Sequence, residues 1–414
     1  MNRAAPRTAG GWTRLRRPFP LLCLLASALW LALATGCANF PFGRGPGQTF
    51  VQTKPAALPA RVLGNYFIVE AEQIDGTVRR FLVDTGSTAT FVSQNLAKAI
   101  GQRERDAAKR TVPVRSANNG EITLETVTLK RLQLGEAKFD RVAALVYDFE
   151  ELSAHLGLTI DGLIGFPVFR NTLLTLDYPH AQLVIAPHQP GAALPRSAGR
   201  VAVIAFNNEQ GTPFIPVQLG NESFVVLVDS GSDGGLQLNP VGLHPRFAFG
   251  PRAGTLVSSI SGDRAQQVGR LGQNLLLGTH VVEQPVVDVT DQLSSIGGEL
   301  LRHFAVTFDQ RRNYATFTRD TDGPVRIEPR RSTGLSFSRA AAYWRVLRIV
   351  PDTPTTQLGL QPGDLVVRIN GEPVAGWSYE RYAALLASAA KVTYTFLTGT
   401  REYDVEIPVF ELVP

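Results

Sequence analysis

Two short loops in this chain combine the residue types that acid–base catalysis needs. Asp84 stands in Phe-Leu-Val-Asp-Thr-Gly-Ser and Asp229 in Val-Leu-Val-Asp-Ser-Gly-Ser, so each carboxyl group ends an apolar run. If the two loops face each other, the carboxylates cannot both ionise, and they share one proton. One can then take a proton from water while the other protonates a scissile carbonyl group. We therefore predict that Asp84 and Asp229 form a catalytic pair.

The residues that follow each aspartate suit such a loop. The glycine lets the backbone bend sharply and lets a second chain approach closely. The hydroxyl residue before it can hydrogen-bond across to the other loop. The serine after it could hydrogen-bond the carboxylate and lower its pKa, which predicts an acid-shifted pair. The supporting residues predicted on this basis are Thr85, Gly86, Ser87, Ser230, Gly231 and Ser232.

The segments around these loops occur twice, in the same order. The run 80–87 recurs as 226–232, and Leu-Ile-Gly at 163–165 recurs as Ser-Ile-Gly at 295–297. Short β-like runs broken by turns fill the chain from about 60 to 320, and the clearest helix is expected at 93–100. This pattern predicts a mainly β fold with two duplicated lobes.

A third unit begins near residue 330. It contains Gly334, Leu335, Ser336 and Phe337 in succession, a strand at 344–349 and a short helix start at 354–358. Ser378 can cap a helix that begins after it, and two strands are expected beyond that helix, at 392–397 and 403–409.

The two aspartate loops resemble the aspartic protease family, in particular the retropepsin-like domains of bacterial proteins. The resemblance covers about 260 residues and implies two β lobes with a substrate cleft between them. Ser295 departs from it by placing a polar residue where the family has an apolar one. Family members cover the substrate with a hairpin, for which Asn119 and Gly120 are the candidates, with 261–263 as a counterpart in the second repeat. Asp233 is similar to a retroviral aspartate that binds substrate backbone, or else it stabilises a turn before two glycines.

The C-terminal unit resembles a PDZ domain of the kind found on bacterial envelope proteases. Residues Gly334, Leu335, Ser336 and Phe337 match the loop whose backbone N–H groups capture a peptide carboxylate. The resemblance therefore implies a peptide-binding groove, and the alternative is a packing domain whose groove is unused or filled.

The N-terminus is typical of a bacterial export signal. Five arginines lie in residues 1–36 with no acidic residue, and the rest of the chain carries 36 basic and 36 acidic residues. A nucleic-acid-binding role therefore loses its main support. An apolar stretch from 21 to 34 leads to Cys37, where lipid attachment after cleavage is favoured over ordinary cleavage. Only two cysteines are present, so no disulfide framework is expected. Cys37 would anchor the protein at the cell envelope, facing the periplasm, and we expect the outer membrane.

Other chemistries find no support in the sequence. It contains no serine-hydrolase or nucleotide-binding motif, and the spacing of its six histidines predicts no metal site and no cofactor. We expect an endopeptidase acting on peptides or proteins, or alternatively a catalytically silent envelope protein that binds peptides. The predicted organisation is a signal peptide at 1–36, a linker at 37–58, a first lobe at 59–192, a second lobe at 193–328 and a PDZ domain at 329–414.

Overall fold

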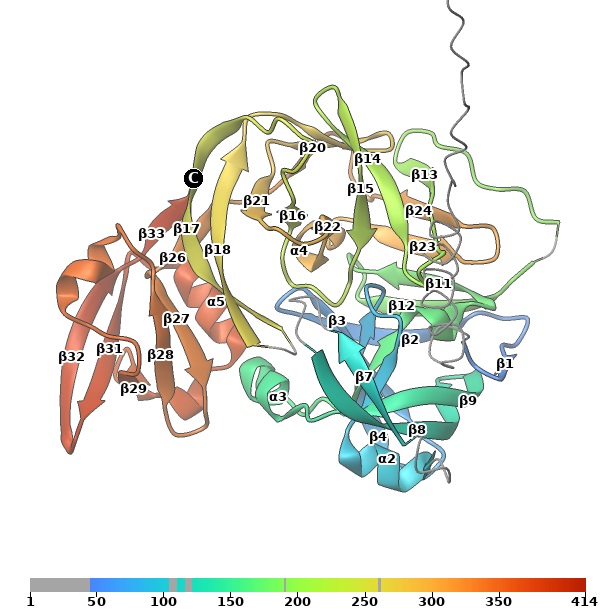
Figure 1. The fold of residues 1–414 in the computed structure, drawn as a ribbon, viewed down its shortest axis with the longest axis horizontal. Coiled ribbons are helices and arrows are strands. Elements are labelled where there is room, and N and C mark those ends of the chain that lie inside the picture. The colour runs from blue at the N-terminus through green and yellow to red at the C-terminus, as the bar shows by residue number, and fades with distance from the viewer. Residues whose placement is uncertain (1–44, 104–109, 116–120, 190, 260–261) are drawn as a thin grey trace, which may run out of the picture. The chain divides into compact units, whose positions relative to one another are not determined.

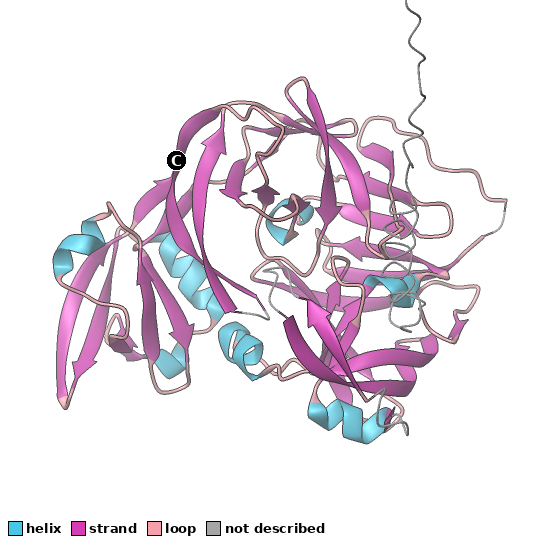
Figure 2. Ribbon diagram, viewed as in Figure 1, coloured by secondary structure: helices cyan, strands magenta, loops and turns pink. Residues whose placement is uncertain are grey.

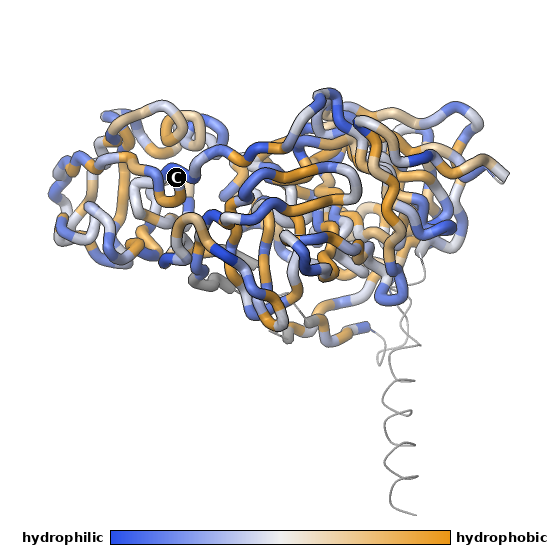
Figure 3. Tube along the Cα trace, turned by 90° about the horizontal axis from the view of Figure 1, so that it is seen from above, coloured by the Kyte–Doolittle hydropathy of each residue, from blue (hydrophilic) through white to orange (hydrophobic). Residues whose placement is uncertain are grey.

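The computed structural model describes residues 45–103, 110–115, 121–189, 191–259 and 262–414. Strands account for 52% and helices for 12% of these described residues, which confirms the predicted mainly β architecture (Figure 2). Hydrophobic and hydrophilic stretches alternate along the chain, and many of the outer turns are hydrophilic (Figure 3). This distribution is what sheets with one buried face require.

The first lobe is built almost entirely from strands. Its elements are β1 (Gln48–Phe50), β2 (Ala56–Leu63), β3 (Tyr66–Glu72), β4 (Val78–Asp84), β5 (Thr90–Val92), α2 (Gln94–Ile100), β6 (Gly101–Arg103), β7 (Thr111–Arg115), β8 (Glu121–Leu134), β9 (Ala137–Val146), α3 (Glu150–Leu156), β10 (Gly162–Gly165), η4 (Phe166–Phe169), β11 (Thr172–Asp177) and β12 (Gln182–Pro187).

The second lobe repeats this plan. Its elements are β13 (Val201–Ala205), β14 (Phe214–Leu219), β15 (Glu222–Val228), β16 (Leu236–Leu238), β17 (Phe247–Ser259), β18 (Gly262–Leu271), β19 (Leu275–Leu277), β20 (His280–Glu283), β21 (Val286–Val289), β22 (Ser295–Ile296), α4 (Gly298–Leu301), β23 (Ala305–Asp309), β24 (Tyr314–Thr318) and β25 (Val325–Arg326).

The C-terminal unit forms a separate sheet with one long helix. Its elements are β26 (Arg330–Ser332), β27 (Leu335–Arg339), β28 (Trp344–Ile349), η5 (Pro354–Leu358), β29 (Leu365–Ile369), β30 (Glu372–Pro373), η6 (Val374–Gly376), α5 (Tyr379–Ser388), β31 (Lys391–Thr398), β32 (Arg401–Pro408) and β33 (Phe410–Val413).

Local signals in the sequence explain where the two best-predicted helices begin. The side chain of Ser93 accepts a hydrogen bond from the backbone N–H of Leu96, and that of Ser378 accepts one from Arg381. Each serine thus satisfies an N–H group that has no partner inside its helix. The helices predicted to follow Ser93 and Ser378 are both confirmed.

The duplicated segments pair with each other at the centre of the protease lobes. Strand β11 of the first lobe pairs antiparallel with β23 of the second, and β12 and β24 flank them (Figure 1). Thr175 lies opposite Thr307 in this pairing, and their hydroxyl groups are 2.8 Å apart. The two copies of one sequence motif therefore meet around an approximate two-fold axis, which joins the lobes into one continuous sheet.

Two boundaries differ in detail from the expected organisation. Strand β1 pairs with β9, and β2 begins at Ala56, so part of the segment predicted as a linker belongs to the first lobe. At the other end, Leu412 and Val413 are buried in the same hydrophobic cluster as the protease lobes. The last strand, β33, pairs with β26 and lies beside β17 and β18, so the chain returns to the second lobe after completing its C-terminal sheet.

Candidate active site

Each aspartate loop rests on a neighbouring parallel strand. Strand β10 lies between β4 and β5, and its Gly165 is in register with Asp84. In the second lobe β22 lies between β15 and β16, and the backbone N–H of Asp229 donates to the carbonyl of Ile296 at 2.9 Å. Val83 and Val228, the residues directly before the two aspartates, are buried in these sheets, which holds the loops in place from below.

Ser295, the residue that departs from the family pattern, keeps this arrangement. It pairs with Leu227 in the register in which Leu163 pairs with Leu82. Its side chain is buried. The polar substitution therefore leaves the strand support of the second loop in the same geometry as that of the first.

Two buried hydroxyl groups lock the loops together. Thr85 Oγ1 donates to the carbonyl of Val228 at 2.6 Å and accepts from the N–H of Ser230 at 3.0 Å. Reciprocally, Ser230 Oγ donates to the carbonyl of Val83 at 2.7 Å and accepts from the N–H of Thr85 at 3.0 Å. Both side chains are fully buried. These four hydrogen bonds fix the separation and orientation of the two loops.

The two carboxyl groups face each other across this joint. They are hydrogen-bonded to one another. The N–H of Gly86 donates to Asp84 Oδ1 at 2.8 Å, and that of Gly231 donates to Asp229 Oδ1 at 3.0 Å. A methyl group on Gly86 would lie 2.3 Å from Oδ1 of Asp229, and one on Gly231 would lie 2.3 Å from Cγ of Asp84. Only glycine leaves room for the opposite carboxyl at either position.

Burial dominates the electrostatics of this pair. It raises the pKa of Asp84 well above its usual range, and the neighbouring Asp229 carboxyl raises that pKa further. Burial also raises the pKa of Asp229, although N–H groups of Gly231 and Ser232 and the hydrogen bond from Asp84 oppose the rise. Two partly desolvated carboxyls that lie against each other disfavour a double negative charge, so the pair retains a proton.

The prediction of an acid-shifted pair is therefore wrong. The hydroxyl of Ser87 donates to the carbonyl of Ala89 at 2.8 Å, so its single proton is not available to a carboxylate. The backbone N–H groups of Ser87 and Ser232 interact with the aspartates and lower their pKa values, but by less than burial raises them.

The predicted substrate-covering segments lie on two hairpins whose tips fall outside the described residues. Strands β7 and β8 pair as far as Arg115 and Glu121, and β17 and β18 pair as far as Ser259 and Gly262. Asn119 and Gly120 themselves lie in the part that is not described. The hairpins around both predicted turns are present.

The first lobe also reaches the second loop through a turn that the sequence did not single out. Asn65, at the β2–β3 turn with φ of 70°, donates from its side chain to the backbone carbonyl of Asp233 at 2.9 Å. Burial, followed by the nearby Asp288 carboxylate, raises the pKa of Asp233 to about 6. Tyr66 lies close to Asp233, Asp229 and Asp84, and burial and these three carboxyls together raise its pKa. No sequence motif links this turn to a loop 168 residues away.

The loop predicted to bind a peptide carboxylate is present in the C-terminal unit. Gly334 has a φ of 80°, which favours glycine, and its N–H donates to Ser332 Oγ at 2.8 Å. Leu335 is buried in the core of this unit. Ser336 Oγ accepts a hydrogen bond from the N–H of Leu256, on β17 of the second lobe, at 3.2 Å. Phe337 packs against Trp344 and Tyr394.

Two further predictions concern the membrane and metals. Cys37 lies outside the described residues. Among the residues that the structure describes, no helix is long and apolar enough to cross a membrane. The same residues contain no cluster of histidine, cysteine, aspartate and glutamate side chains arranged to hold a metal ion.

Comparison with known proteins supports both resemblances. Residues 71–168 match the aspartyl protease family, and residues 345–396 match the PDZ domain. The first match contains Asp84 and its supporting strand β10, whereas Asp229 lies beyond it. No curated protein matches the chain. The chain therefore contains a retropepsin-like aspartyl protease domain followed by a C-terminal PDZ domain.

Proposed function

We propose that this protein is an aspartic endopeptidase in which Asp84 and Asp229 form the catalytic pair. The observation that carries the proposal is the meeting of two half-buried, hydrogen-bonded carboxyl groups on loops that four reciprocal hydrogen bonds hold together. This arrangement supplies one acid and one base at a single point, which hydrolysis of an amide requires.

In the proposed reaction the pair shares one proton, because burial raises the pKa values of both carboxyls, and the cycle starts with that proton on Asp84. Asp229 accepts a proton from water as the water oxygen attacks the scissile carbonyl carbon, and Asp84 gives its proton to the carbonyl oxygen. The resulting diol collapses when the amide nitrogen takes the proton from Asp229 and the C–N bond breaks. The diol returns its other proton to Asp84, which restores the pair with one proton.

The remaining predicted residues take supporting roles in this proposal. The two hairpins cover an extended peptide, and Asp233 binds its backbone beside Asn65 and Tyr66. The PDZ domain binds a peptide segment of the substrate or of a regulator. We further propose that a lipid at Cys37 anchors the protein to the cell envelope, facing the periplasm. Mass spectrometry of the mature N-terminus tests this, and an unacylated N-terminus away from Cys37 would refute it.

The alternative is a silent protein that binds peptides without cutting them. It is favoured by one observation, that the family match stops before Asp229. Turnover of an unfolded protein separates the two functions, with the variants Asp84→Asn and Asp229→Asn, pepstatin as a probe, and Asp140→Asn as a control. Asp140 is an aspartate paired with Arg131 in the first lobe, away from the aspartate loops. We expect both active-site variants to lose turnover and the control to keep it. Equal cleavage by the wild type and either active-site variant would refute the proposal, and peptide binding without turnover by the wild type would establish the alternative.

A further inference from the structure

Arg339, at the end of strand β27, forms no ion pair with an acidic group of the residues that the structure describes. Its guanidinium lies over the rings of Trp344, Tyr379 and Tyr382 at 4.3, 5.2 and 5.2 Å from their centroids. Its Nε and Nη1 atoms are buried and form no hydrogen bond with any described residue. Contact with aromatic faces stabilises a cation, but it offsets only part of the cost of burying an unpaired charge.

The position of Arg339 is that of a peptide-binding groove. Within the described chain β27 pairs only with β28, so its other edge has free backbone groups. Arg339 is two residues beyond Phe337, and residues two apart on a strand point to the same face. Both side chains face helix α5, where each contacts the ring of Tyr382. A peptide added to this edge would run between β27 and α5, past the guanidinium.

Parts of the protease lobes lie at this edge. Helix α3 of the first lobe lies beside β27. Its His155 packs against the ring of Tyr379 with centroids 5.2 Å apart, and burial, followed by the charge of Arg339, lowers the pKa of His155 to about 4. The first lobe therefore places the neutral imidazole of His155 near Arg339, and not an anion. A carboxylate in its place would form charge-assisted hydrogen bonds with the free N–H groups.

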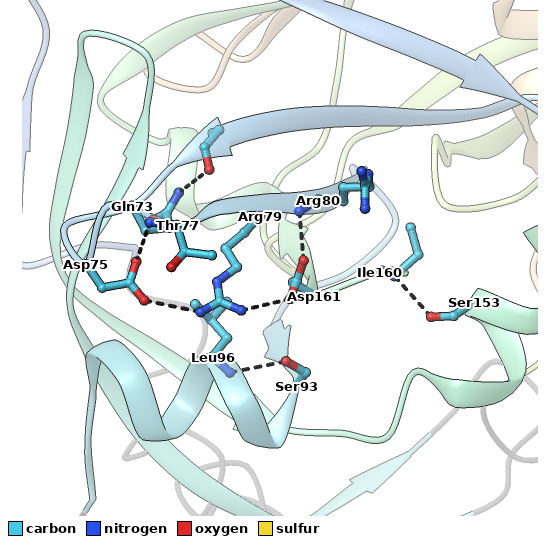
Figure 4. A network of polar contacts seen from close by, with 11 residues as sticks. Gln73, Asp75, Thr77, Arg79, Arg80, Ser93, Leu96, Ser153, Ile160 and Asp161 are labelled. Carbon is cyan, nitrogen blue, oxygen red and sulfur yellow. Dashed lines mark hydrogen bonds and ion pairs between the residues drawn. The ribbon is translucent and has the colours of Figure 1, made fainter. Parts of the chain in front are cut away.

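Helix α3 is linked to the strand that carries Asp84. Ser153 of this helix accepts a hydrogen bond from the N–H of Ile160 at 3.0 Å. The next residue, Asp161, accepts from the backbone N–H of Arg80 at 3.0 Å and contacts the guanidinium of Arg79 at 3.4 Å, both on β4 (Figure 4). A displacement of α3 would therefore be transmitted through Ile160 and Asp161 to β4, the strand that ends in Asp84.

We propose that the groove between β27 and α5 selects a peptide with an acidic side chain, which pairs with Arg339 and takes the place of helix α3. The exchange frees α3 from the PDZ domain and thereby regulates the cleft. The regulation of the cleft rests on the proposed peptidase function, whereas the selection of an acidic peptide and the displacement of α3 do not.

Binding to the full chain tests the selection. The probes are two labelled pools of decapeptides with free C-termini and degenerate sequence, in which glutamate or glutamine is fixed at one of the last five positions. The background is Asp84→Asn, so that no probe is cut. Fluorescence anisotropy should show about 10-fold tighter binding of the glutamate pool at one position. Arg339→Gln should abolish this preference, Arg339→Lys should retain part of it, and Arg345→Gln, an exposed arginine on the neighbouring strand, should leave it unchanged.

The displacement is tested separately. His155→Ala removes part of the competing contact and should tighten binding of the glutamate pool several-fold; an unchanged affinity would overturn the exchange. Equal affinities of the two pools for the parent chain would overturn the selection, even if Arg339→Gln fails to fold. If the parent chain binds selectively but the wild type cuts no substrate with or without the pool, the proposed peptidase function fails and the selection stands. If the wild type cuts but the pool leaves the rate unchanged, only the regulation fails.

Discussion

The hydroxyl joint between the two aspartate loops makes a quantitative prediction. Thr85→Val keeps the shape of a buried side chain and removes its oxygen, which leaves the carbonyl of Val228 and the N–H of Ser230 without that partner. Each buried polar group left unpaired costs about 1–3 kcal/mol, so the variant should lose about 4 kcal/mol of unfolding free energy. Such a loss is a large part of the about 5–15 kcal/mol that stabilises a typical domain.

The same change should reduce the proposed peptidase activity. The four cross-bonds set the separation of the carboxyls, and a misplacement of about 1 Å in a catalytic group lowers rates by about 100-fold. Urea unfolding followed by far-ultraviolet circular dichroism measures the stability. Circular dichroism is chosen over tryptophan fluorescence because Trp344 and Trp377, the only tryptophans after residue 37, both lie in the PDZ domain. Their fluorescence would report the unfolding of that domain alone.

Thr175→Val is the matched control. It removes the partly buried hydrogen bond of 2.8 Å between the hydroxyl groups of Thr175 and Thr307, which joins the same two lobes away from the aspartate loops. We expect a loss of about 1 kcal/mol and unchanged activity. If Thr85→Val costs no more than Thr175→Val and retains full activity, the loops are held together by something other than these hydroxyl groups, and the reasoning is refuted.

Four further predictions follow from the site and its surroundings. Because burial raises the pKa values of Asp84 and Asp229, the alkaline limb of the pH–rate profile should lie above the usual aspartate value of about 3.9; a limb below it would contradict the burial argument. The protonated pair contributes to the free energy of unfolding, and this contribution should be lost as pH rises above the usual aspartate value through the raised pKa values of the pair. Asp229→Asn removes this loss, so it should stabilise the fold relative to wild type more at pH 7 than at pH 3 in thermal unfolding. Gly86→Ala should abolish activity, because its methyl group would lie 2.3 Å from Asp229, and normal turnover by this variant would disprove the close approach. Arg330→Met should lower the free energy of unfolding in urea by about 3–5 kcal/mol. It removes the cation that lies 2.6 Å from the carboxylate of Asp288 and 3.1 Å from that of Glu299. A loss under about 1 kcal/mol would contradict this prediction.

Much of the fold could be predicted because its signals are local. Apolar runs, turn residues and capping serines act over a few residues, so the strands around both loops and the helices after Ser93 and Ser378 were recognisable. The duplication made the pairing of the two aspartate loops an expectation as well. The polar residue at 295 gave reason to doubt the second loop, yet the structure places it in the register of its apolar counterpart.

What the sequence could not show depends on contacts between distant segments. The pKa direction of Asp84 and Asp229 was predicted wrongly, because serine hydroxyls are visible in a sequence whereas burial is a property of the folded chain. In the same way, nothing local indicates that Asn65 reaches the second loop.

The sequence by itself determined which residues form strands, turns and caps, and it placed two aspartates in equivalent loops. The tertiary structure alone decided that these carboxyls face each other in a partly desolvated site, that the last strand returns to the second lobe, and that Arg339 lies beside a neutral histidine from the first lobe. The physical reason is that backbone geometry follows from neighbours in sequence, whereas desolvation and charge pairing follow from neighbours in space.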